Sequence, residues 1–233
     1  MNNNDQKQLA ISVRNVGVAY RQKAGMFRSK KYWALKDISF DLFHGETLGI
    51  IGRNGVGKST LLRLLTGIIS PDKGSFINHG VTASLLSLQL GFVPYLTGRE
   101  NVILSGMMLG LSKSQILNKM DEIQIYADVG VFFDQPVQVY SSGMRSRVGF
   151  SIAIYTDADV ILLDEVLGVG DTDFRKKSAK TMRDMIKSNK TIVLVSHSMK
   201  LIQEICDRVI FIDDGTSLET GNPSYIIEKY IEK

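Results

Sequence analysis

Residues 52–59 read Gly52-Arg53-Asn54-Gly55-Val56-Gly57-Lys58-Ser59, which fits the Gly-x-x-x-x-Gly-Lys-Ser pattern of a phosphate-binding P-loop, the Walker A motif. The apolar run 48–51 before it predicts a buried strand, and leucines at helical spacing over 61–65 predict a helix after it. A glycine-rich turn in this setting aims backbone N–H groups and the positive end of a helix at an anion. A turn that binds nothing is the alternative, but all fixed positions and both flanking elements agree with the P-loop.

P-loop chemistry gives the residues of this stretch separate roles. Lys58 is placed to reach the β- and γ-phosphates of a nucleoside triphosphate, and the Ser59 hydroxyl, with Thr60 beside it, is placed to ligate Mg²⁺. The backbone that folds over the phosphates is expected to come from Gly52, Asn54, Gly55 and Gly57.

Composition limits the class of protein. The chain has 233 residues, 44% of them hydrophobic, enough for a full core. No apolar run approaches the roughly 18 residues that span a bilayer, and residues 1–8 are polar, so we expect a cytoplasmic protein that needs a partner at any membrane. Cys206 is the only cysteine, which excludes an intrachain disulfide and favours a packing role. A net charge of +4 does not indicate a nucleic-acid partner.

The first third of the chain reads as β-structure. Apolar and polar residues alternate over 9–20 and again over 38–42, with an interruption at 21–32. A turn at His44-Gly45 then leads into the strand before the P-loop. After the P-loop helix, the turn at 71–74 predicts a strand pair through Phe76 and 81–86.

The middle of the chain changes to a helical pattern. Thr97 with Glu100, and Ser112 with Gln115, form two capping boxes, and apolar residues then recur at helical spacing over 116–127. Strands over 160–163, 191–195 and 209–212 later alternate with helices over 174–187 and 199–206. Asp214-Gly215 predicts a hairpin turn, and Ser224 is expected to cap a last helix.

Together these elements predict an α/β fold. Its sheet is mostly parallel, because strands alternate with helices, and it is preceded by an N-terminal antiparallel β subdomain. A helical subdomain at about 94–155 is inserted into it. We expect residues 1–233 to form one domain.

Two acids follow the buried strand 160–163. Asp164 completes a Walker B motif and is expected to hold Mg²⁺, and Glu165 is placed to act as the general base on the attacking water. A structural Asp-Glu pair at a strand end is common, but the P-loop upstream favours the catalytic interpretation.

The stretch Tyr140-Ser141-Ser142-Gly143-Met144, which opens a helix, resembles the signature motif of the ATP-binding cassette (ABC) family, Leu-Ser-Gly-Gly-Gln. Ser141 and Gly143 match this pattern, whereas Tyr140, Ser142 and Met144 depart from it. The resemblance implies an ABC ATPase core. It also implies that Ser141 and the Gly143 amide contact the γ-phosphate of ATP held by a second copy, in a head-to-tail homodimer.

Four further residues take roles that the same resemblance implies. His197, which follows the strand 191–195, matches the switch histidine that contacts the γ-phosphate, and Asp171 matches the acid of the D-loop. Gln89 is the candidate for the Q-loop glutamine, although it stands out of the usual register. Tyr20 is the candidate for stacking on adenine, with Tyr32 and Trp33 as alternatives.

Three segments resemble one branch of the family, the ATPase subunits that export lipid-linked polysaccharides such as O-antigen, capsule and teichoic acid. These are Leu-Thr-Gly-Arg-Glu-Asn at 96–101, Tyr-Ser-Ser-Gly-Met at 140–144 and Asp-Glu-Val-Leu-Gly-Val-Gly-Asp at 164–171. The resemblance implies an ATPase on the cytoplasmic face of the inner membrane that drives a pair of transmembrane permease subunits. Some members carry a C-terminal carbohydrate-binding domain, and we expect none here.

Three other functions are alternatives to this one. An ABC ATPase for another cargo, a drug, lipid or peptide, is the nearest alternative. A P-loop regulator or GTPase is disfavoured, because Asn189-Lys190-Thr191-Ile192 lacks the acid of the guanine-reading motif. A nucleic-acid-directed cassette protein commonly has two cassettes or a long coiled-coil insertion, and neither is found in this sequence.

The interruption at 21–32 is a basic segment that has two interpretations. It contains five cations and no acid, with Met26 and Phe27 among them. A solvated loop is one interpretation. The other is a surface for an anionic membrane leaflet, where each cation contributes about 1 kcal/mol, or for the pyrophosphate of a lipid-linked sugar. The cations are Arg21, Lys23, Arg28, Lys30 and Lys31.

Overall fold

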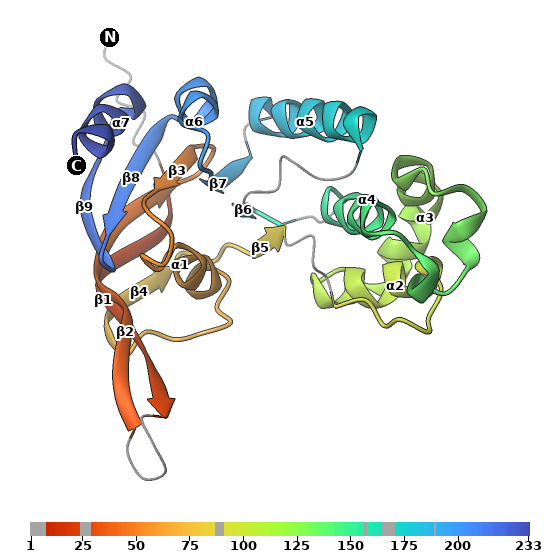
Figure 1. The fold of residues 1–233 in the computed structure, drawn as a ribbon, viewed down its shortest axis with the longest axis horizontal. Helices are drawn as coiled ribbons and strands as arrows, with labels where there is room; N and C mark the ends of the chain where they lie inside the picture. Colours follow the sequence, from red (N-terminus) through yellow and green to blue (C-terminus); the bar gives the residue numbers. More distant parts are fainter. Residues whose placement is uncertain (1–7, 24–28, 87–90, 156–157, 165–170, 189) are drawn as a thin grey trace. The chain divides into compact units, whose positions relative to one another are not determined.

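The computed structural model describes residues 8–23, 29–86, 91–155, 158–164, 171–188 and 190–233. The chain divides into two compact units. Unit 1 comprises Met1–Leu85, Asp159–Asp164 and Ile186–Lys233, and unit 2 comprises Leu86–Ala158 and Glu165–Met185 (Figure 1). Unit 2 contains the helices expected at 94–155 and also most of a helix that the sequence pattern grouped with the sheet. The organisation as one domain stays a prediction.

Unit 1 is built on a mixed sheet whose strand order is β4-β1-β2-β9-β8-β3-β7-β6-β5 (Figure 1). Strands β3, β6, β7 and β8 run parallel to one another, whereas β1 pairs antiparallel with β2 and β4, and β8 with β9. The predicted α/β fold with a mostly parallel core and an N-terminal antiparallel part is therefore confirmed. The strands are β1 (Leu9–Lys23), β2 (Ser29–Phe43), β3 (Thr47–Ile51), β4 (Lys73–Asn78), β5 (Ala83–Leu86), β6 (Val160–Asp164), β7 (Thr191–Val195), β8 (Arg208–Asp213) and β9 (Thr216–Gly221).

The first two strands are longer than the sequence pattern indicates. Tyr20 pairs with Tyr32 and Arg21 with Lys31, so the ladder of β1 and β2 continues through most of the predicted interruption at 21–32. That interruption was wrong for 21–23 and 29–32, and residues 24–28 lie outside the described part. Apolar residues stop alternating with polar ones here, and Arg21, Lys30 and Lys31 are exposed, so periodicity did not indicate this part of the two strands.

The predicted strand pair after the P-loop helix is also wrong. β4 pairs with β1, whereas β5 lies at the opposite edge of the sheet, next to β6. Asn78 explains the change of direction, because its Oδ1 accepts hydrogen bonds from the backbone N–H groups of Gly80 (2.9 Å) and Val81 (2.8 Å). Thr82 then donates to Asp159 through N–H and hydroxyl, both at 2.8 Å, which fixes β5 beside β6 and lowers the pKa of that carboxyl.

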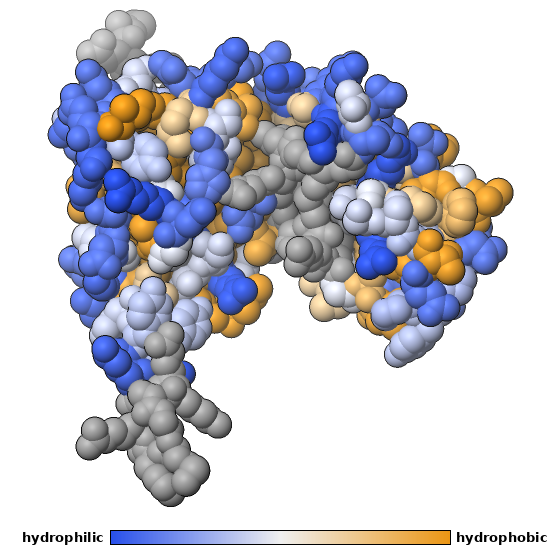
Figure 2. Space-filling model, viewed as in Figure 1, coloured by the Kyte–Doolittle hydropathy of each residue, from blue (hydrophilic) through white to orange (hydrophobic). Residues whose placement is uncertain are grey.

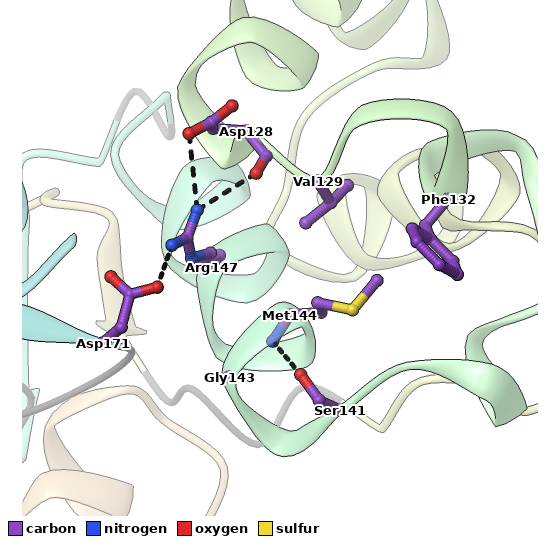
Figure 3. A pocket seen from close by; sticks show the side chains of 8 residues that line it. All are labelled: Asp128, Val129, Phe132, Ser141, Gly143, Met144, Arg147 and Asp171. Atoms are coloured by element: carbon purple, nitrogen blue, oxygen red, sulfur yellow. Dashed lines mark hydrogen bonds and ion pairs between the residues drawn. The ribbon is translucent and has the colours of Figure 1, made fainter. Parts of the chain in front are cut away.

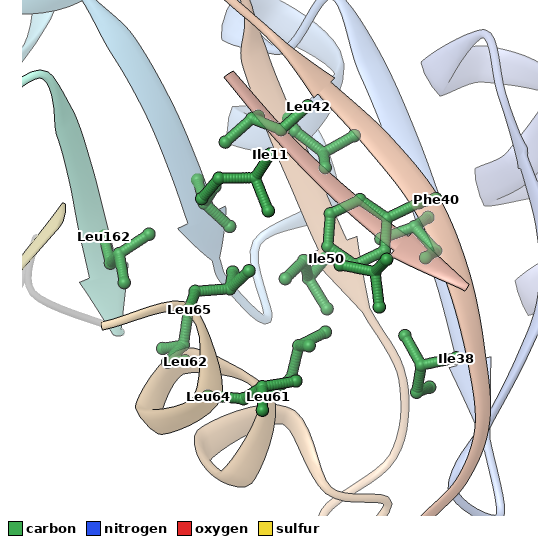
Figure 4. Close-up of a cluster of buried hydrophobic side chains, with 14 of the residues drawn as sticks. Ile11, Ile38, Phe40, Leu42, Ile50, Leu61, Leu62, Leu64, Leu65 and Leu162 are labelled. Atoms are coloured by element: carbon green, nitrogen blue, oxygen red, sulfur yellow. The ribbon is translucent and has the colours of Figure 1, made fainter. Parts of the chain in front are cut away.

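The core of unit 1 lies between the sheet and helix α1 (Lys58–Leu65). Leu61, Leu62 and Leu64 are fully buried in a cluster with apolar residues of β1, β2, β3, β6, β7 and β8 (Figure 4). Burying each such side chain contributes about 1.5–3 kcal/mol, which fixes the helix that follows the P-loop. The other buried residues labelled in Figure 4 are Ile11, Ile38, Phe40, Leu42, Ile50, Leu65 and Leu162.

Two more helices belong to unit 1, α6 (Met199–Ile205) and α7 (Pro223–Glu232). Cys206 ends α6 and is buried beside Gly49, where an added Cβ would lie 3.0 Å from the thiol sulfur. Burial raises the pKa of this thiol to about 12. The predicted cap of α7 was wrong by two residues: Asn222 Oδ1 accepts from Ser224 N–H at 3.0 Å, because Pro223 occupies the first helical position.

Unit 2 consists mainly of four α-helices, α2 (Gly98–Met108), α3 (Lys113–Ala127), α4 (Ser142–Ala153) and α5 (Thr172–Lys187). Both capping boxes are present as predicted. Short 3₁₀ helices, η1 (Gly130–Asp134) and η2 (Val137–Val139), connect α3 to α4. Apolar side chains of α3 and η1 remain exposed, as Figure 2 shows, among them Ile125 (75% exposed) and Val131 (82%).

Candidate functional site

The predicted site residues of unit 1 gather at one edge of its sheet. β3, β7 and β6 are neighbours and run parallel, with Val195 of β7 opposite both Ile50 and Asp164. The P-loop follows β3, His197 follows β7 by two residues, and Asp164 is the last residue of β6. Because parallel strands end at the same edge, three segments far apart in sequence meet there.

Ser59 and Asp164 connect the two Walker motifs. The Ser59 hydroxyl, at the start of α1, donates a hydrogen bond to Asp164 Oδ2 at 3.2 Å. Asp164 is half-buried and Ser59 is exposed, so both oxygens are accessible from outside. The two predicted Mg²⁺ ligands therefore lie together, 105 positions apart in sequence.

Lys58 bends back over its own loop. Its ammonium donates to the carbonyl oxygens of Gly52 (2.7 Å) and Arg53 (2.9 Å), and its side chain is buried. Burying an ammonium is costly unless it has acceptors, and these carbonyls supply them. The cation is thus held inside the loop that is predicted to surround the phosphates.

The glycines of the loop are required by its conformation. Gly57 has a φ of 104°, and an added Cβ would lie 2.4 Å from Ala34 O of β2. Gly52 packs against β8 in the same way, with an added Cβ 2.3 Å from Ile212 O. Since the N-cap of α1 is Gly57, no side chain in the described residues caps this helix, and its first N–H groups face the loop. Asn54, Gly55 and Thr60 lie in the same segment, with Asn54 and Gly55 exposed.

Of three other predicted residues, His197 lies in the described part of the chain, whereas Glu165 and Gln89 do not. His197 is exposed at the sheet edge, directly before Ser198, which caps α6 by accepting from Leu201 N–H at 3.3 Å. Glu165 and Gln89 lie outside the described residues. Their roles stay predictions.

The candidate adenine residues lie on the hairpin of unit 1. Tyr20 is 37% exposed and Tyr32, its partner across the strands, 46%. Trp33 is already covered, because the ammonium of Lys31 lies 4.4 Å from its ring centre and its ring fills the space above Gly17. Because Lys31 covers its ring, Trp33 is less available than Tyr20 for stacking on adenine. The role of Tyr20 stays a prediction.

The signature residues begin helix α4 in unit 2. Ser141 is the N-cap, and its hydroxyl oxygen accepts from Met144 N–H at 3.1 Å. A Cβ added at Gly143 would meet only this hydroxyl, at 3.7 Å, so the first turn of the helix is open to an approaching group. The N-terminus of α4 therefore has the geometry of an anion site.

Tyr140, a departure from the family pattern, has a structural reason. Its ring is buried and its hydroxyl donates to Phe132 O at 2.7 Å, while burial raises its pKa to about 12. The backbone of Gly98 packs against this ring, since an added Cβ would lie 2.1 Å from the hydroxyl. The phenol thus connects the start of α2 with the segment before α4.

A pocket of about 410 Å³ lies beside the signature residues (Figure 3). Arg147 of α4 points into it and makes hydrogen bonds both to Asp128, at the end of α3, and to Asp171, before α5. Sequence reasoning missed Arg147, because its partners lie 19 and 24 positions away and follow no local pattern. The lining residues are Asp128, Val129, Phe132, Ser141, Gly143, Met144, Arg147 and Asp171.

Comparisons with known proteins show which proteins the chain resembles. The O-antigen export system ATP-binding protein RfbB of Klebsiella pneumoniae is 45% identical over 205 residues, 88% of this chain and 83% of the relative. The teichoic acids export ATP-binding protein TagH of Listeria monocytogenes serotype 4b is 40% identical over 238 residues, covering 97% and 71%. A solved dimeric ATP-binding cassette in a post-hydrolysis state with ADP and Pi has a TM-score of 0.74 over 91% of this chain and 98% of its own, at 21% identity, and so shares the fold.

Within the described part of the chain, no helix combines the length and the apolar character needed to cross a membrane. The sequence model of the family described as "ABC transporter" matches residues 35–168, which include the P-loop, the signature stretch and Asp164. On this match and the identities above, the chain belongs to the ABC transporter family, as one of its ATP-binding cassette subunits.

Proposed function

We propose that this chain is the ATP-hydrolysing subunit of a transporter that exports a lipid-linked polysaccharide. The observation that carries the choice of cargo is the identity of 45% and 40% to ATP-binding proteins named for O-antigen and teichoic acid export. The three segments at 96–101, 140–144 and 164–171 support the same branch. Export of a drug, lipid or peptide by the same kind of ATPase is the second candidate.

Hydrolysis is assigned to residues at the sheet edge and directly after it. Lys58 and the N–H groups at the start of α1 neutralise the phosphates, because they present positive charge to an anion. Glu165 accepts a proton from the attacking water, and His197 holds the γ-phosphate. Tyr20 stacks on the adenine, and Gln89 is the Q-loop glutamine.

The donor atoms of the site fit Mg²⁺. Ser59 Oγ and Asp164 Oδ2 are hard oxygen ligands 3.2 Å apart, and Mg²⁺ prefers such oxygens together with water and substrate phosphates. When bound, the ion neutralises phosphate charge that develops during the reaction. Ser59 and Asp164 would hold it in position. In the described residues no cluster of three or more His, Cys, Asp or Glu offers another metal site.

Each ATP is shared between two copies in this proposal. The N-terminus of α4, with Ser141 and Gly143, is a second anion site in unit 2, and a head-to-tail homodimer brings it to the phosphates held by the P-loop of a partner. The geometry of the Ser141 cap and the open space at Gly143 support this role. The dimer acts on a pair of transmembrane permease subunits and is peripheral to the cytoplasmic face of the inner membrane.

The experiment that tests the cargo uses the intact transporter. The chain is purified with its membrane subunits from cells that carry either the wild-type chain or Lys58→Ala, and lipids bound to the complex are identified by mass spectrometry. We expect an undecaprenyl-linked sugar in the complex and its accumulation in Lys58→Ala cells, because export stops without hydrolysis. Normal export of all surface glycans by Lys58→Ala cells, with another compound class retained instead, contradicts polysaccharide export.

A further inference from the structure

Arg147 stands at the junction of three helices in unit 2. Its Nη1 donates to the carbonyl oxygen of Asp128 at 3.0 Å and lies 3.5 Å from the Asp128 carboxylate, while its Nη2 donates to Asp171 Oδ2. The guanidinium also lies over the ring of Phe174, 5.2 Å from its centre, and the side chain is only 17% exposed. One side chain of α4 thereby contacts the end of α3 and the start of α5.

Asp171 has two protein partners within its own subunit. Oδ1 accepts from Phe174 N–H at 3.0 Å, so Asp171 caps α5, and Oδ2 accepts from Arg147. The Phe174 N–H, followed by the Arg147 guanidinium, lowers the pKa of this carboxyl. Each oxygen therefore has a protein donor, which gives this side chain a structural role within its own subunit.

Arg147 and Asp171 each lie a few residues from a residue with a proposed role in hydrolysis. Arg147 lies six residues after the cap Ser141, about 9 Å along the helix axis. Asp171 lies six residues after Glu165 in sequence. A guanidinium that is mostly covered and donates to two residues at once holds its partners in a narrow range of positions, because hydrogen bonds to a charged group are short and directional.

We infer that Arg147 and Asp171 are a positioning pair: they fix the N-terminus of α4, with Ser141 and Gly143, relative to the start of α5. The inference rests on the proposed function, since it assigns the pair to ATP hydrolysis by the dimer. It predicts an effect on the turnover step. Capture of nucleotide by the P-loop, whose hydrogen bonds lie within unit 1, does not depend on the pair.

The test separates the ion pair from the helix cap. Asp171→Asn keeps the cap, because asparagine caps helices as well as aspartate, but removes the charge that faces Arg147. Arg147→Met keeps a long side chain against Phe174 and removes the donors. The matched control is Asp128→Asn, which removes the other carboxylate near Arg147 and keeps both the carbonyl contact and the left-handed backbone of Asp128 (φ 50°).

Steady-state hydrolysis, binding of a fluorescent ATP analogue and thermal unfolding are measured for the full chain and each variant. We expect kcat to fall about tenfold in Asp171→Asn and in Arg147→Met, with KM and analogue affinity unchanged. The double variant should lose no more than either single one, and Asp128→Asn should keep the wild-type kcat.

Three results would overturn the pair: wild-type kcat in Asp171→Asn, additive losses in the double variant, or an equal loss in Asp128→Asn. A lowered Tm with unchanged kcat per folded molecule would show a role in stability alone, and would overturn it too. Hydrolysis by the wild-type chain tests the proposed function separately from the positioning pair. A wild-type chain that hydrolyses no ATP contradicts the proposed function, whatever the variants do.

Discussion

Gly57 is a P-loop position where both the backbone conformation and a neighbouring strand exclude a side chain. Its backbone is in the left-handed region, and the carbonyl of Ala34 occupies the place of a Cβ. Gly67, just after α1, also has a positive φ (74°) but has nothing within 4 Å of an added Cβ. A side chain at Gly67 would therefore cause backbone strain alone, whereas a side chain at Gly57 would cause both strain and a steric clash.

Gly57→Ala is expected to weaken nucleotide binding by at least about tenfold, because strain of 1–2 kcal/mol is added to a clash with β2. The measurement is titration with a fluorescent ATP analogue. Gly67→Ala is the control, and it should lower stability slightly without changing affinity. Equal affinity of Gly57→Ala and wild type would contradict the described loop conformation.

Glu165→Gln should bind ATP without turning it over. Glutamine keeps the size and hydrogen bonding of the side chain but removes the general base, so dimers that hold ATP should accumulate. Steady-state hydrolysis and sedimentation with MgATP check both points. The same substitution at Glu228, exposed on α7, serves as the control. Turnover close to wild type in Glu165→Gln would remove the proposed base.

Local sequence motifs predicted the residues of the Walker A and Walker B motifs but did not predict Arg147. Lys58, Ser59 and Asp164 belong to patterns in which the spacing itself carries the chemistry, and the structure brings Ser59 and Asp164 together. Arg147 belongs to none. Its contacts to Asp128 and Asp171 depend on how α3, α4 and α5 pack, which a single sequence does not state.

The hairpin of β1 and β2 presents cations along its outer part. Arg21 and Lys30 are exposed, whereas Lys31 is 3.6 Å from Asp72 and covers Trp33. Replacing Lys31 by an acid would place two carboxylates together. Arg21 and Lys30 are therefore the better pair for testing whether this basic segment recognises an anionic surface.

Replacing Arg21 and Lys30 together by Glu should leave ATP hydrolysis by the isolated chain nearly unchanged and should sharply reduce polysaccharide export in cells. Each cation near an anionic surface contributes about 1 kcal/mol, and the reversal removes it and adds repulsion. Lys180→Glu with Lys187→Glu, on exposed positions of α5, is the control for changed net charge. Unimpaired export at equal protein level would contradict recognition of an anionic surface and leave the interpretation as a solvated loop.

Helix α7 depends on Asn222 rather than on the predicted Ser224. Asn222→Ala should lower the free energy of unfolding by about 1 kcal/mol, because it removes the acceptor for Ser224 N–H. For a chain of this size we expect Tm to fall by about 2–4 °C. Asn222→Asp retains a capping oxygen and should stay close to wild type. A thermal melt of the three proteins decides between the two caps.

Periodicity located the central strands and helices well, because β3, β6 and β7 are short continuous apolar runs and the capping boxes mark α2 and α3. It failed where pairing partners decide the structure. β4 and β5 are close in sequence yet lie at opposite edges of the sheet, and only long-range pairing determines this.

The proposed dimer divides each ATP site between two chains, and this division can be tested by mixing. Lys58→Ala damages the P-loop half of a site, and Ser141→Arg damages the signature half. A dimer with one change in each chain has one site with both defects and one site with none. It should recover hydrolysis that neither variant shows alone.

Two differently tagged chains, purified sequentially, give the mixed dimer, and its ATP hydrolysis is compared with both parent variants. A mixed dimer of two Lys58→Ala chains with different tags is the control for handling. If the mixed dimer forms and hydrolyses nothing, the two halves of a site come from the same chain or the two sites do not act independently.

Cys206 makes the whole chain convenient for thiol labelling. Burial raises the pKa of this thiol to about 12, so at neutral pH it holds far less thiolate than an exposed cysteine. A maleimide dye will therefore react with a cysteine introduced at an exposed position long before it reaches Cys206. Probes for distance measurements between two copies can be attached to the natural background, with no need to delete the native cysteine from behind the P-loop strand.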